Sequence, residues 1–308
     1  MGHNSTVHQQ SQSKMFEGFT SFDIETQSDP PVSIHGIRGG SGPALLLLHG
    51  FPQTHHIWHR VAPQVINNFT VVALDIRGYG ASSKPSGVAQ YSKTLMSRDC
   101  AIVMEKLGFT SFFVCAHDRG ARVAHKLLVN YPERVRKAIF LDICPTLAMY
   151  SKTDFEFAKT YFHWFFLIQK YPLPETLIGQ NPRKWAELFM GGRHAGLVAF
   201  DKDNFEEYVK VLEDPDAVHA MCEDYRASAS VDMDEAKEDI QEGRLVQCPL
   251  KVFWAKNGVI EKCFDAVREW KDVAGPGVEI DGGNVDCGHY IPEEAPDLVS
   301  KNIQNFFV

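Results

Sequence analysis

Short runs of apolar residues alternate along this chain with longer stretches in which apolar residues recur every three or four positions. The short runs are typical of buried strands, and the longer stretches are typical of helices that pack on a sheet. We therefore predict strands at residues 44–48, 70–74, 112–116, 138–142, 249–255 and 278–280. Strands that alternate with helices favour an α/β fold with a mostly parallel sheet flanked by helices.

The pattern changes between the fourth and fifth predicted strands. Residues 147–245 contain no clear buried strand, but they carry many aromatic and charged residues at helical spacing, with Pro172 and Pro174 as helix breakers. We expect this segment to be an inserted helical cap that closes over the strand ends. The core would then comprise residues 15–146 and 246–308, and the polar residues 1–14 are predicted to form a disordered tail.

The predicted strand 112–116 leads into a motif that indicates catalysis. Ala116 and Gly120 flank Asp118 at the positions that a nucleophile elbow reserves for small residues, but an aspartate stands where a serine is usual. An aspartate that attacks a saturated carbon forms an ester, which water can reopen. The motif therefore predicts nucleophilic displacement at an sp3 carbon, and the alternative is an aspartate that only caps the following helix.

Displacement through an ester needs a base for the hydrolytic step. His289 lies in a glycine-rich loop before the last predicted helix, the place of the histidine in the chain order nucleophile, acid, histidine. The turn after strand 249–255 has no carboxylate, so Asp142, at the end of the preceding strand, is the favoured orienting acid. Glu261 and Asp286 are weaker candidates for that place.

The hydrolytic step also builds negative charge on an oxygen, which preorganised donors can stabilise. The loop after the first predicted strand begins at His49, and we expect the backbone N–H groups of Phe51 and Arg119 to form this oxyanion hole. Three further histidines follow closely: His55, His56 and His59. No carboxylate joins them in the motif, so a helix face is favoured over a metal site, and no metal or organic cofactor is expected.

Composition limits the class of protein. Acidic residues number 39 against 31 Lys and Arg, and no basic block suggests nucleic acid. The longest aliphatic run, residues 44–48, is too short to span a bilayer, and the polar N-terminus lacks the apolar segment of a signal peptide. Seven scattered cysteines favour reduced thiols. We therefore expect a cytoplasmic protein without membrane or nucleic-acid partners.

Seven segments, taken together, resemble one known family. They are residues 49–54, 75–80, 117–122, 141–146, 163–164, 221–227 and 288–296. Together they resemble the fluoroacetate dehalogenases of the alpha/beta-hydrolase superfamily, from about residue 16 to the C-terminus. The first two segments recur widely in that superfamily, whereas an arginine pair beside the aspartate with His163, Trp164 and Tyr225 is much more specific.

The resemblance implies a homodimer that hydrolyses a small 2-haloacid such as fluoroacetate to the 2-hydroxy acid and halide. Arg119 and Arg122 would hold the carboxylate of this small anionic substrate, because guanidinium groups at the opening of a helix favour an anion. His163, Trp164 and Tyr225 would donate hydrogen bonds to the departing halide. No cofactor is implied.

Two other functions stay open. Epoxide hydrolases share the fold and the aspartate nucleophile, but they polarise the epoxide with two cap tyrosines. Tyr225 could be one of them, and the second would have to be Tyr150, Tyr161 or Tyr171. The third possibility is a non-catalytic binding protein on the same scaffold. Such a protein would tolerate the loss of catalytic groups, but all of them are present here.

Two departures from the family concern the size of the pocket. Gly191-Gly192-Arg193-His194 replaces a bulkier stretch in the predicted cap, and Met149 stands where the family has an aromatic residue. Both changes could enlarge or reshape the site. A larger 2-haloacid, the preference for fluoride or chloride, and residual epoxide hydrolysis therefore stay open.

Overall fold

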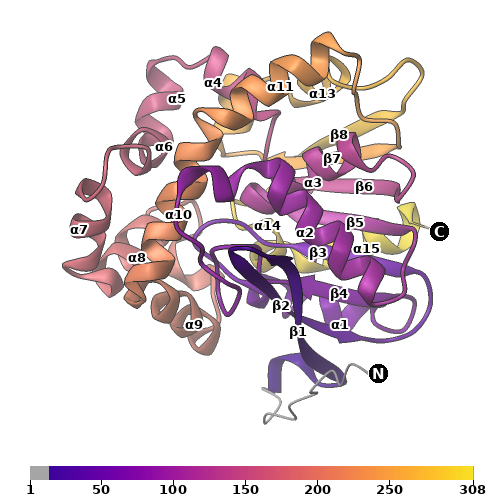
Figure 1. Ribbon diagram of the computed structural model, residues 1–308, viewed down its shortest axis with the longest axis horizontal. Helices are drawn as coiled ribbons and strands as arrows, with labels where there is room; N and C mark the ends of the chain where they lie inside the picture. Colours follow the sequence, from indigo (N-terminus) through magenta and orange to yellow (C-terminus); the bar gives the residue numbers. More distant parts are fainter. Residues whose placement is uncertain (1–13, 308) are drawn as a thin grey trace.

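A central sheet organises the computed structural model, which describes residues 14–307 (Figure 1). Within that range the sheet has eight strands, in the order β1-β2-β4-β3-β5-β6-β7-β8. Its antiparallel edge consists of β1 (Phe19–Ser28) and β2 (Pro31–Gly39), and β2 also pairs antiparallel with β4 (Thr70–Leu74). The remaining pairs are parallel and add β3 (Ala44–Leu48), β5 (Phe112–His117), β6 (Val135–Leu141), β7 (Leu250–Ala255) and β8 (Ile280–Val285). The predicted α/β fold class is confirmed.

Helices cover both faces of the sheet, which is why its inner strands are apolar along their whole length. Leu46 and Leu48 of β3 lie in one core with residues of α2 (Lys93–Lys106) and α3 (Asp118–Asn130). Leu45 and Leu47, which point the opposite way, lie in a second core with residues of α1 (Ala62–Val65) and α15 (Pro296–Phe306). Short helical turns and helices complete the core: η1 (Lys14–Phe16), η2 (His55–Trp58), η3 (Val88–Tyr91), α12 (Val259–Cys263), α13 (Ala266–Lys271) and α14 (Ile291–Glu294).

Three expectations about this core need correction. The sequence pattern did not predict the β1–β2 hairpin, because its strands alternate buried and exposed residues instead of forming apolar runs. The last strand occupies Ile280–Val285 and not 278–280, since only its two end residues are buried. The tail was predicted at residues 1–14. Residues 1–13 lie outside the described residues, and Lys14 already begins η1.

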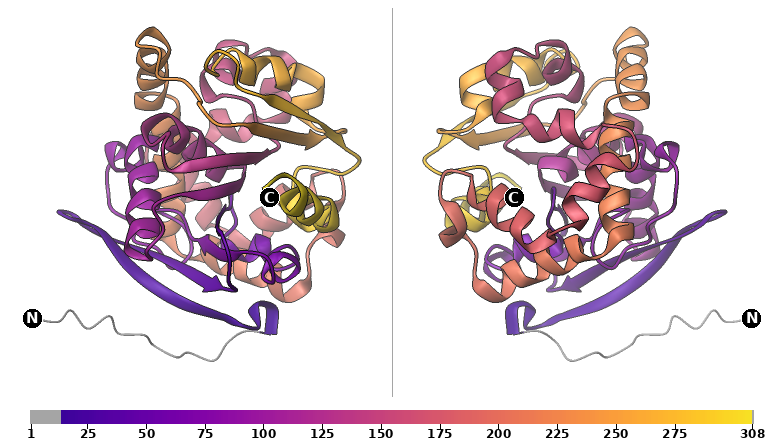
Figure 2. Two further views of the ribbon diagram at one scale, coloured as in Figure 1. Left: turned by 90° about the vertical axis from the view of Figure 1, so that its right-hand side faces the viewer. Right: turned by 90° about the vertical axis from the view of Figure 1, so that its left-hand side faces the viewer.

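Only helices lie between β6 and β7. They are α4 (Thr146–Ser151), α5 (Phe155–Thr160), α6 (Phe162–Leu167), α7 (Leu173–Gly179), α8 (Pro182–Gly191), η4 (Gly196–Ala199), α9 (Lys202–Glu213), α10 (Pro215–Ser228) and α11 (Val231–Gln241). Figures 1 and 2 show α5 to α10 gathered on one side of the molecule, beside the core. Among residues 14–307, no helix is long and apolar enough to cross a bilayer.

Candidate active site

Asp118 lies at the sharp turn between β5 and α3, with a φ of 46°. This left-handed conformation is unfavourable for a residue with a side chain and is typical of functional sites. Two glycines make the turn sterically possible. A Cβ on Gly120 would lie 2.2 Å from the carbonyl oxygen of His49, and a Cβ on Gly50 would lie 2.4 Å from the Cβ of Asp118. The chain at His49 and Gly50 is therefore packed directly against the elbow.

The two carboxylate oxygens of Asp118 have different surroundings. Oδ1 accepts a hydrogen bond of 2.8 Å from the backbone N–H of Phe51, a donor predicted for the oxyanion hole. Oδ2 lies 3.9 Å from Nε2 of His289, too far for a hydrogen bond. Phe51 thus holds Oδ1, whereas Oδ2 is the carboxylate oxygen that faces His289.

His289 is oriented from its far side by Asp142. Nδ1 of His289 lies 2.5 Å from Oδ2 of Asp142, whose Oδ1 accepts the backbone N–H of Ala255 at 2.8 Å. Of the three acids considered from the sequence, Asp142 is the one in contact with His289. Asp286 is exposed, and Glu261 is hydrogen-bonded to Trp254. Asp142 also has a positive φ, 56°, just beyond the end of β6.

The ionisation of Asp118 suits a nucleophile. Burial raises the pKa of its carboxyl, but the neighbouring His289, followed by His117 and the two arginines, lowers this pKa by more than burial raises it. The net result is a pKa below the usual range of an aspartate. The side chain is therefore an ionised carboxylate at neutral pH, although it is only 3% exposed.

Arg119 and Arg122 are both buried beside the nucleophile, and each has one free donor. Asp224 and Ser228 bind Nε and Nη2 of Arg119, which leaves Nη1 without a partner. Arg122 contacts Thr146 and Met149 among other groups, and its Nε has no partner. Asp224 thus occupies most of the guanidinium of Arg119, a residue predicted to hold the substrate carboxylate, while Nη1 of Arg119 and Nε of Arg122 have no partner.

Three cap side chains predicted to bind halide converge on this place. Trp164 lies over the guanidinium of Arg122 at 4.6 Å, and Tyr225 lies over that of Arg119 at 4.2 Å. Nε1 of Trp164, the hydroxyl of Tyr225 and Nδ1 of His163 are buried and have no hydrogen-bond partner. Unpartnered buried donors are rare in proteins, because each loses its hydrogen bonds to water. Their clustering indicates that a polar ligand completes the site.

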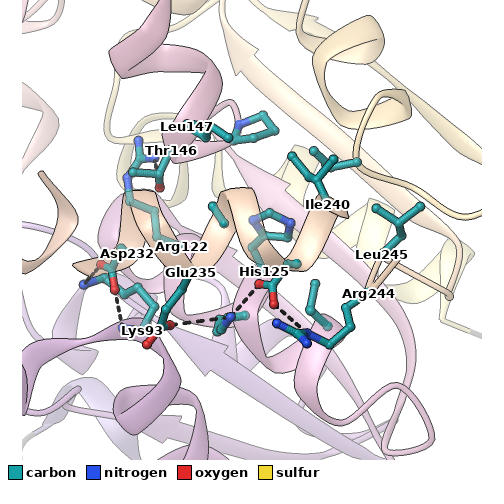
Figure 3. A pocket seen from close by; sticks show the side chains of 16 residues that line it. Lys93, Arg122, His125, Thr146, Leu147, Asp232, Glu235, Ile240, Arg244 and Leu245 are labelled. Carbon is teal, nitrogen blue, oxygen red and sulfur yellow. Dashed lines mark hydrogen bonds and ion pairs between the residues drawn. The ribbon is translucent and has the colours of Figure 1, made fainter. Parts of the chain in front are cut away.

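The cap is anchored to the core behind Arg122. Figure 3 shows a narrow cavity there, lined by Arg122 and by residues of α3 and α11. Ion pairs bridge its walls, from Lys93 to Asp232 at 3.1 Å and from Lys126 to Glu235 at 3.5 Å. The first pair holds α11 against the start of α2, and the second holds it against α3, the helix that begins at Asp118.

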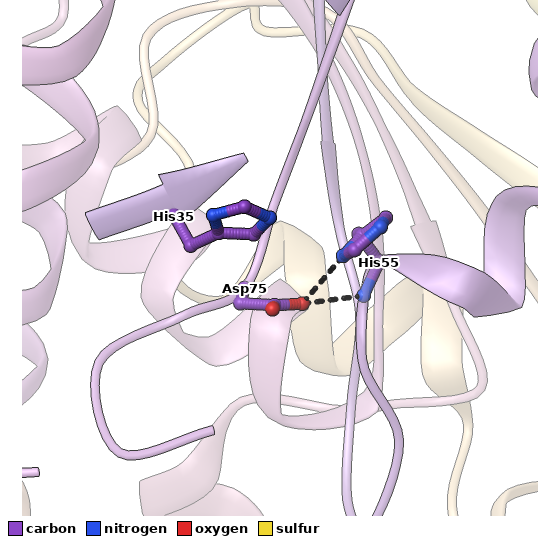
Figure 4. Close-up of side chains that lie close together, drawn as sticks. All are labelled: His35, His55 and Asp75. Carbon is purple, nitrogen blue, oxygen red and sulfur yellow. Dashed lines mark hydrogen bonds and ion pairs between the residues drawn. The ribbon is translucent and has the colours of Figure 1, made fainter. Parts of the chain in front are cut away.

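The histidine cluster near the oxyanion loop also acquires a carboxylate in space. Figure 4 shows Asp75 beside His35 and His55. Oδ1 of Asp75 accepts both the backbone N–H of His55 and its ring Nδ1, each at 2.8 Å, and Oδ2 accepts the N–H of Ala81 at 2.9 Å. The sequence motif itself holds no carboxylate beside His55, His56 and His59, but the fold brings Asp75 into contact with His55. The carboxylate instead ties the oxyanion loop to the following turn, and the absence of a metal stays a prediction.

Two residues lie near the reaction centre in places that the sequence did not predict: Tyr161 was considered only as a tyrosine that polarises an epoxide, and Arg193 only as part of a stretch that reshapes the pocket. The hydroxyl of Tyr161 lies 3.4 Å from Nδ1 of His289, and the guanidinium carbon of Arg193 lies 5.0 Å from the centre of the Tyr161 ring. No local motif surrounds either residue. Only the packing of the cap against the core brings them to the site.

Comparisons with known proteins identify the family of this chain. A family model described as alpha/beta hydrolase fold matches residues 43–189. A fluoroacetate dehalogenase of Burkholderia sp is 40% identical over 95% of both chains. This chain belongs to the alpha/beta-hydrolase family. The resemblance to the fluoroacetate dehalogenases that its motifs predicted is confirmed.

Two further relatives extend the comparison. A solved structure from Nostoc sp PCC 7120, assigned to the alpha/beta hydrolases, is 43% identical, covers 94% of this chain and 98% of its own, and superimposes with a TM-score of 0.89. A soluble epoxide hydrolase of Corynebacterium sp. (strain C12) is 27% identical over 89% of this chain and 93% of its own. Relatives with both activities therefore share almost the whole length of the chain.

Proposed function

We propose that this protein is a dehalogenase that hydrolyses a small 2-haloacid, such as fluoroacetate, through an ester on Asp118. Its family and its 40% identical relative support a hydrolase that acts on carbon–halide bonds. The observation that carries the finer assignment is the set of buried donors without partners on the two arginines beside Asp118 and on the rings that lie over them. They belong to Arg119, Arg122, Trp164 and Tyr225.

In the first step, Nη1 of Arg119 and Nε of Arg122 hold the substrate carboxylate so that its α-carbon faces Oδ2 of Asp118. The bond from Oδ2 to carbon forms as the carbon–fluorine bond breaks, and fluoride leaves with the bonding electron pair. Fluoride is a poor leaving group, so donors must stabilise its growing charge. Trp164 and Tyr225 supply two of them. Burial and the charge of Arg193 keep the pKa of His163 well below its usual value, so His163 acts as a neutral donor.

In the second step, water attacks the carbonyl carbon of the ester and gives a proton to Nε2 of His289, which Asp142 orients. Negative charge develops on Oδ1 of Asp118, the oxygen that already accepts the N–H of Phe51. The backbone N–H of Arg119 is the second donor that we propose. Collapse of this intermediate releases the 2-hydroxy acid, whose hydroxyl takes the proton back from His289 and whose oxygen was Oδ2 of Asp118.

The helical segment between β6 and β7 is proposed to cover Asp118. Residues 147–245 are proposed to act as a lid that excludes water from the charged nucleophile, in line with the 3% exposure of Asp118 and the 0% exposure of Trp164 and Tyr225. The homodimer and the cytoplasmic location implied earlier stay predictions.

The halide pocket is tested by comparing Tyr225→Phe with Tyr171→Phe, a matched change at a cap tyrosine that is 68% exposed. Loss of one hydrogen bond to the departing fluoride should lower kcat/KM for fluoroacetate about tenfold to a hundredfold. Chloroacetate should lose less, since chloride is the weaker acceptor, and Tyr171→Phe should change neither. Equal losses for both haloacids would contradict a role of Tyr225 in fluoride release.

Epoxide hydrolysis is the second candidate, and one observation favours it. The hydroxyl of Tyr150 is buried without a partner, and its ring lies 4.7 Å from that of Trp164. With Tyr225 it could polarise an epoxide oxygen, whereas Tyr161 instead contacts His289 and Tyr171 is exposed. Diol formed from styrene oxide, with no halide released from any haloacid, would support this function over dehalogenation. Halide release with no diol would exclude it.

A non-catalytic binding protein has less support. Such a protein does not need a histidine held between an acid and a nucleophile, yet Asp118, His289 and Asp142 lie in that order here. Turnover of any substrate by the purified protein would remove this alternative.

A further inference from the structure

Arg193 is a cation without an acidic partner at the edge of the reaction centre. It lies between α8 and η4, where the chain has just passed two glycines, and its side chain is partly buried. Among the described residues, no carboxylate lies within ion-pair distance of its guanidinium. Instead its guanidinium carbon lies over two aromatic rings, 5.0 Å from the centre of Tyr161 and 5.1 Å from that of Phe189.

The two rings connect Arg193 to the catalytic groups. Tyr161 reaches Nδ1 of His289 with its hydroxyl at 3.4 Å. Phe189 packs edge-on against His163, with 4.9 Å between ring centres, and against Phe51, with 5.4 Å between ring centres. Arg193 thus contacts the two rings that in turn contact His289, His163 and Phe51.

A cleft of about 370 Å³ lies beside these residues, with Phe189 and Arg193 in its lining. Its lining is mostly apolar and includes Phe162, Trp185, Leu188 and Phe189, with Arg193 as its one charged residue. Phe189 is therefore shared between the cleft and the ring cluster around His163. An apolar cleft with one cation is typical of a site that binds a hydrocarbon chain ending in an anion.

Arg193 keeps its charge in this setting. Burial lowers its pKa, but the neighbouring acidic groups, with Tyr161 and Tyr290 ahead of Asp118 and Asp142, raise the pKa above its usual value. Folding has already removed part of the water around the guanidinium, because the rings of Tyr161 and Phe189 lie against it. A carboxylate that docks on it therefore forms a charge-assisted hydrogen bond at little further cost.

We propose that Arg193 and this cleft form a second substrate subsite, which binds the distal carboxylate of a 2-halo dicarboxylic acid with a short methylene chain. The inference rests on the proposed dehalogenase function and deepens it. Arg119 and Arg122 hold the carboxylate next to the reacting carbon, and Arg193 holds the distal one where Tyr161 and Phe189 meet. The apolar lining of the cleft packs against the methylene groups.

The test compares two substrates of equal chain length, 2-bromohexanoate and 2-bromohexanedioate, with chloroacetate as the reference. The wild type should release bromide from the diacid with a kcat/KM about tenfold to a hundredfold higher than from the monoacid. Arg193→Gln should bring this ratio close to one, and Arg193→Lys should keep part of it. A ratio measured within one variant is insensitive to partial loss of folded protein.

The control is Arg183→Gln, which removes an exposed arginine of α8 that pairs with Glu206. It should leave the diacid preference unchanged. Wild-type turnover of chloroacetate without a diacid preference, or a preference that Arg193→Gln retains, would overturn the subsite and leave the proposed function intact. No halide from any of the three substrates would overturn both.

Discussion

Replacing His289 by Asn should separate the two steps of the proposed reaction. The first step depends little on His289, because Phe51 holds Oδ1 of Asp118 and Nε2 of His289 lies 3.9 Å from Oδ2. The variant removes the group that lowers the pKa of Asp118 most, yet Arg119 and Arg122 still lower that pKa. Asp118 should therefore stay ionised and still displace fluoride.

The second step loses its base. Asn cannot accept the proton of the attacking water, and general-base catalysis contributes about 10²- to 10⁴-fold, equivalent to about 3–5 kcal/mol of barrier. Ester hydrolysis should slow by this factor while ester formation changes far less. The variant should therefore accumulate the ester on Asp118.

The assay mixes enzyme with excess fluoroacetate and follows fluoride over time. His289→Asn should release about one fluoride per active site and then stall, and mass spectrometry should find a carboxymethyl group on the peptide that contains Asp118. In wild-type enzyme, a single turnover in water enriched in heavy oxygen should label Asp118 and not the product. His219→Asn, a cap histidine paired with Glu175 at 3.0 Å, is the matched control and should turn over normally.

Two results would refute the reasoning. Steady turnover by His289→Asn at the wild-type rate would remove His289 from the hydrolytic step. A folded variant that binds fluoroacetate but shows neither burst nor adduct would mean that His289 is also needed for the displacement.

Three further predictions concern the site and its support. Gly50→Ala should lower fluoride release at least about a hundredfold, because the new Cβ would lie 2.5 Å from Oδ1 of Asp118 and displace the nucleophile, as steady-state kinetics can measure. Asp224→Asn leaves the buried guanidinium of Arg119 without its charge partner and should lower the free energy of unfolding by about 3–5 kcal/mol in urea titrations. Burial raises the pKa of Glu293 to about 8, so the native state holds a proton that the unfolded chain has lost and stability should fall as pH rises toward 8. Glu293→Gln should flatten that dependence in thermal melts between pH 5 and 8.

Each of these has a control or a contradicting outcome. Gly179→Ala, at a position with nothing within 4 Å of the new Cβ, should leave turnover unchanged. Unchanged urea stability of Asp224→Asn would show that Arg119 does not depend on this ion pair. Parallel melting curves for Glu293→Gln and wild type across the pH range would contradict a neutral Glu293 in the folded protein.

The sequence by itself determined the features that depend on residues close together in the chain. A run of apolar residues, a small residue on either side of Asp118 and a helical pattern behind it are sufficient for a strand, a sharp turn and a helix. The same holds for the α/β class, since alternation of buried runs with helical stretches is a local signal repeated along the chain. Motifs also placed His289 and Asp142 as candidates, because chain order alone distinguishes them from most other residues.

Only the tertiary structure decided which groups meet across distant segments. Asp224, which follows Arg119 by more than a hundred residues, binds most of its guanidinium, and this pairing leaves one nitrogen for substrate. Asp75 joins His55 in the same way, although no acid stands near that histidine in the motif. The sequence singled out the stretch that contains Arg193 only for the size of the pocket and gave Arg193 no role of its own. Ion pairs and aromatic contacts form between side chains brought together by the packing of cap on core, and sequence spacing does not encode that packing.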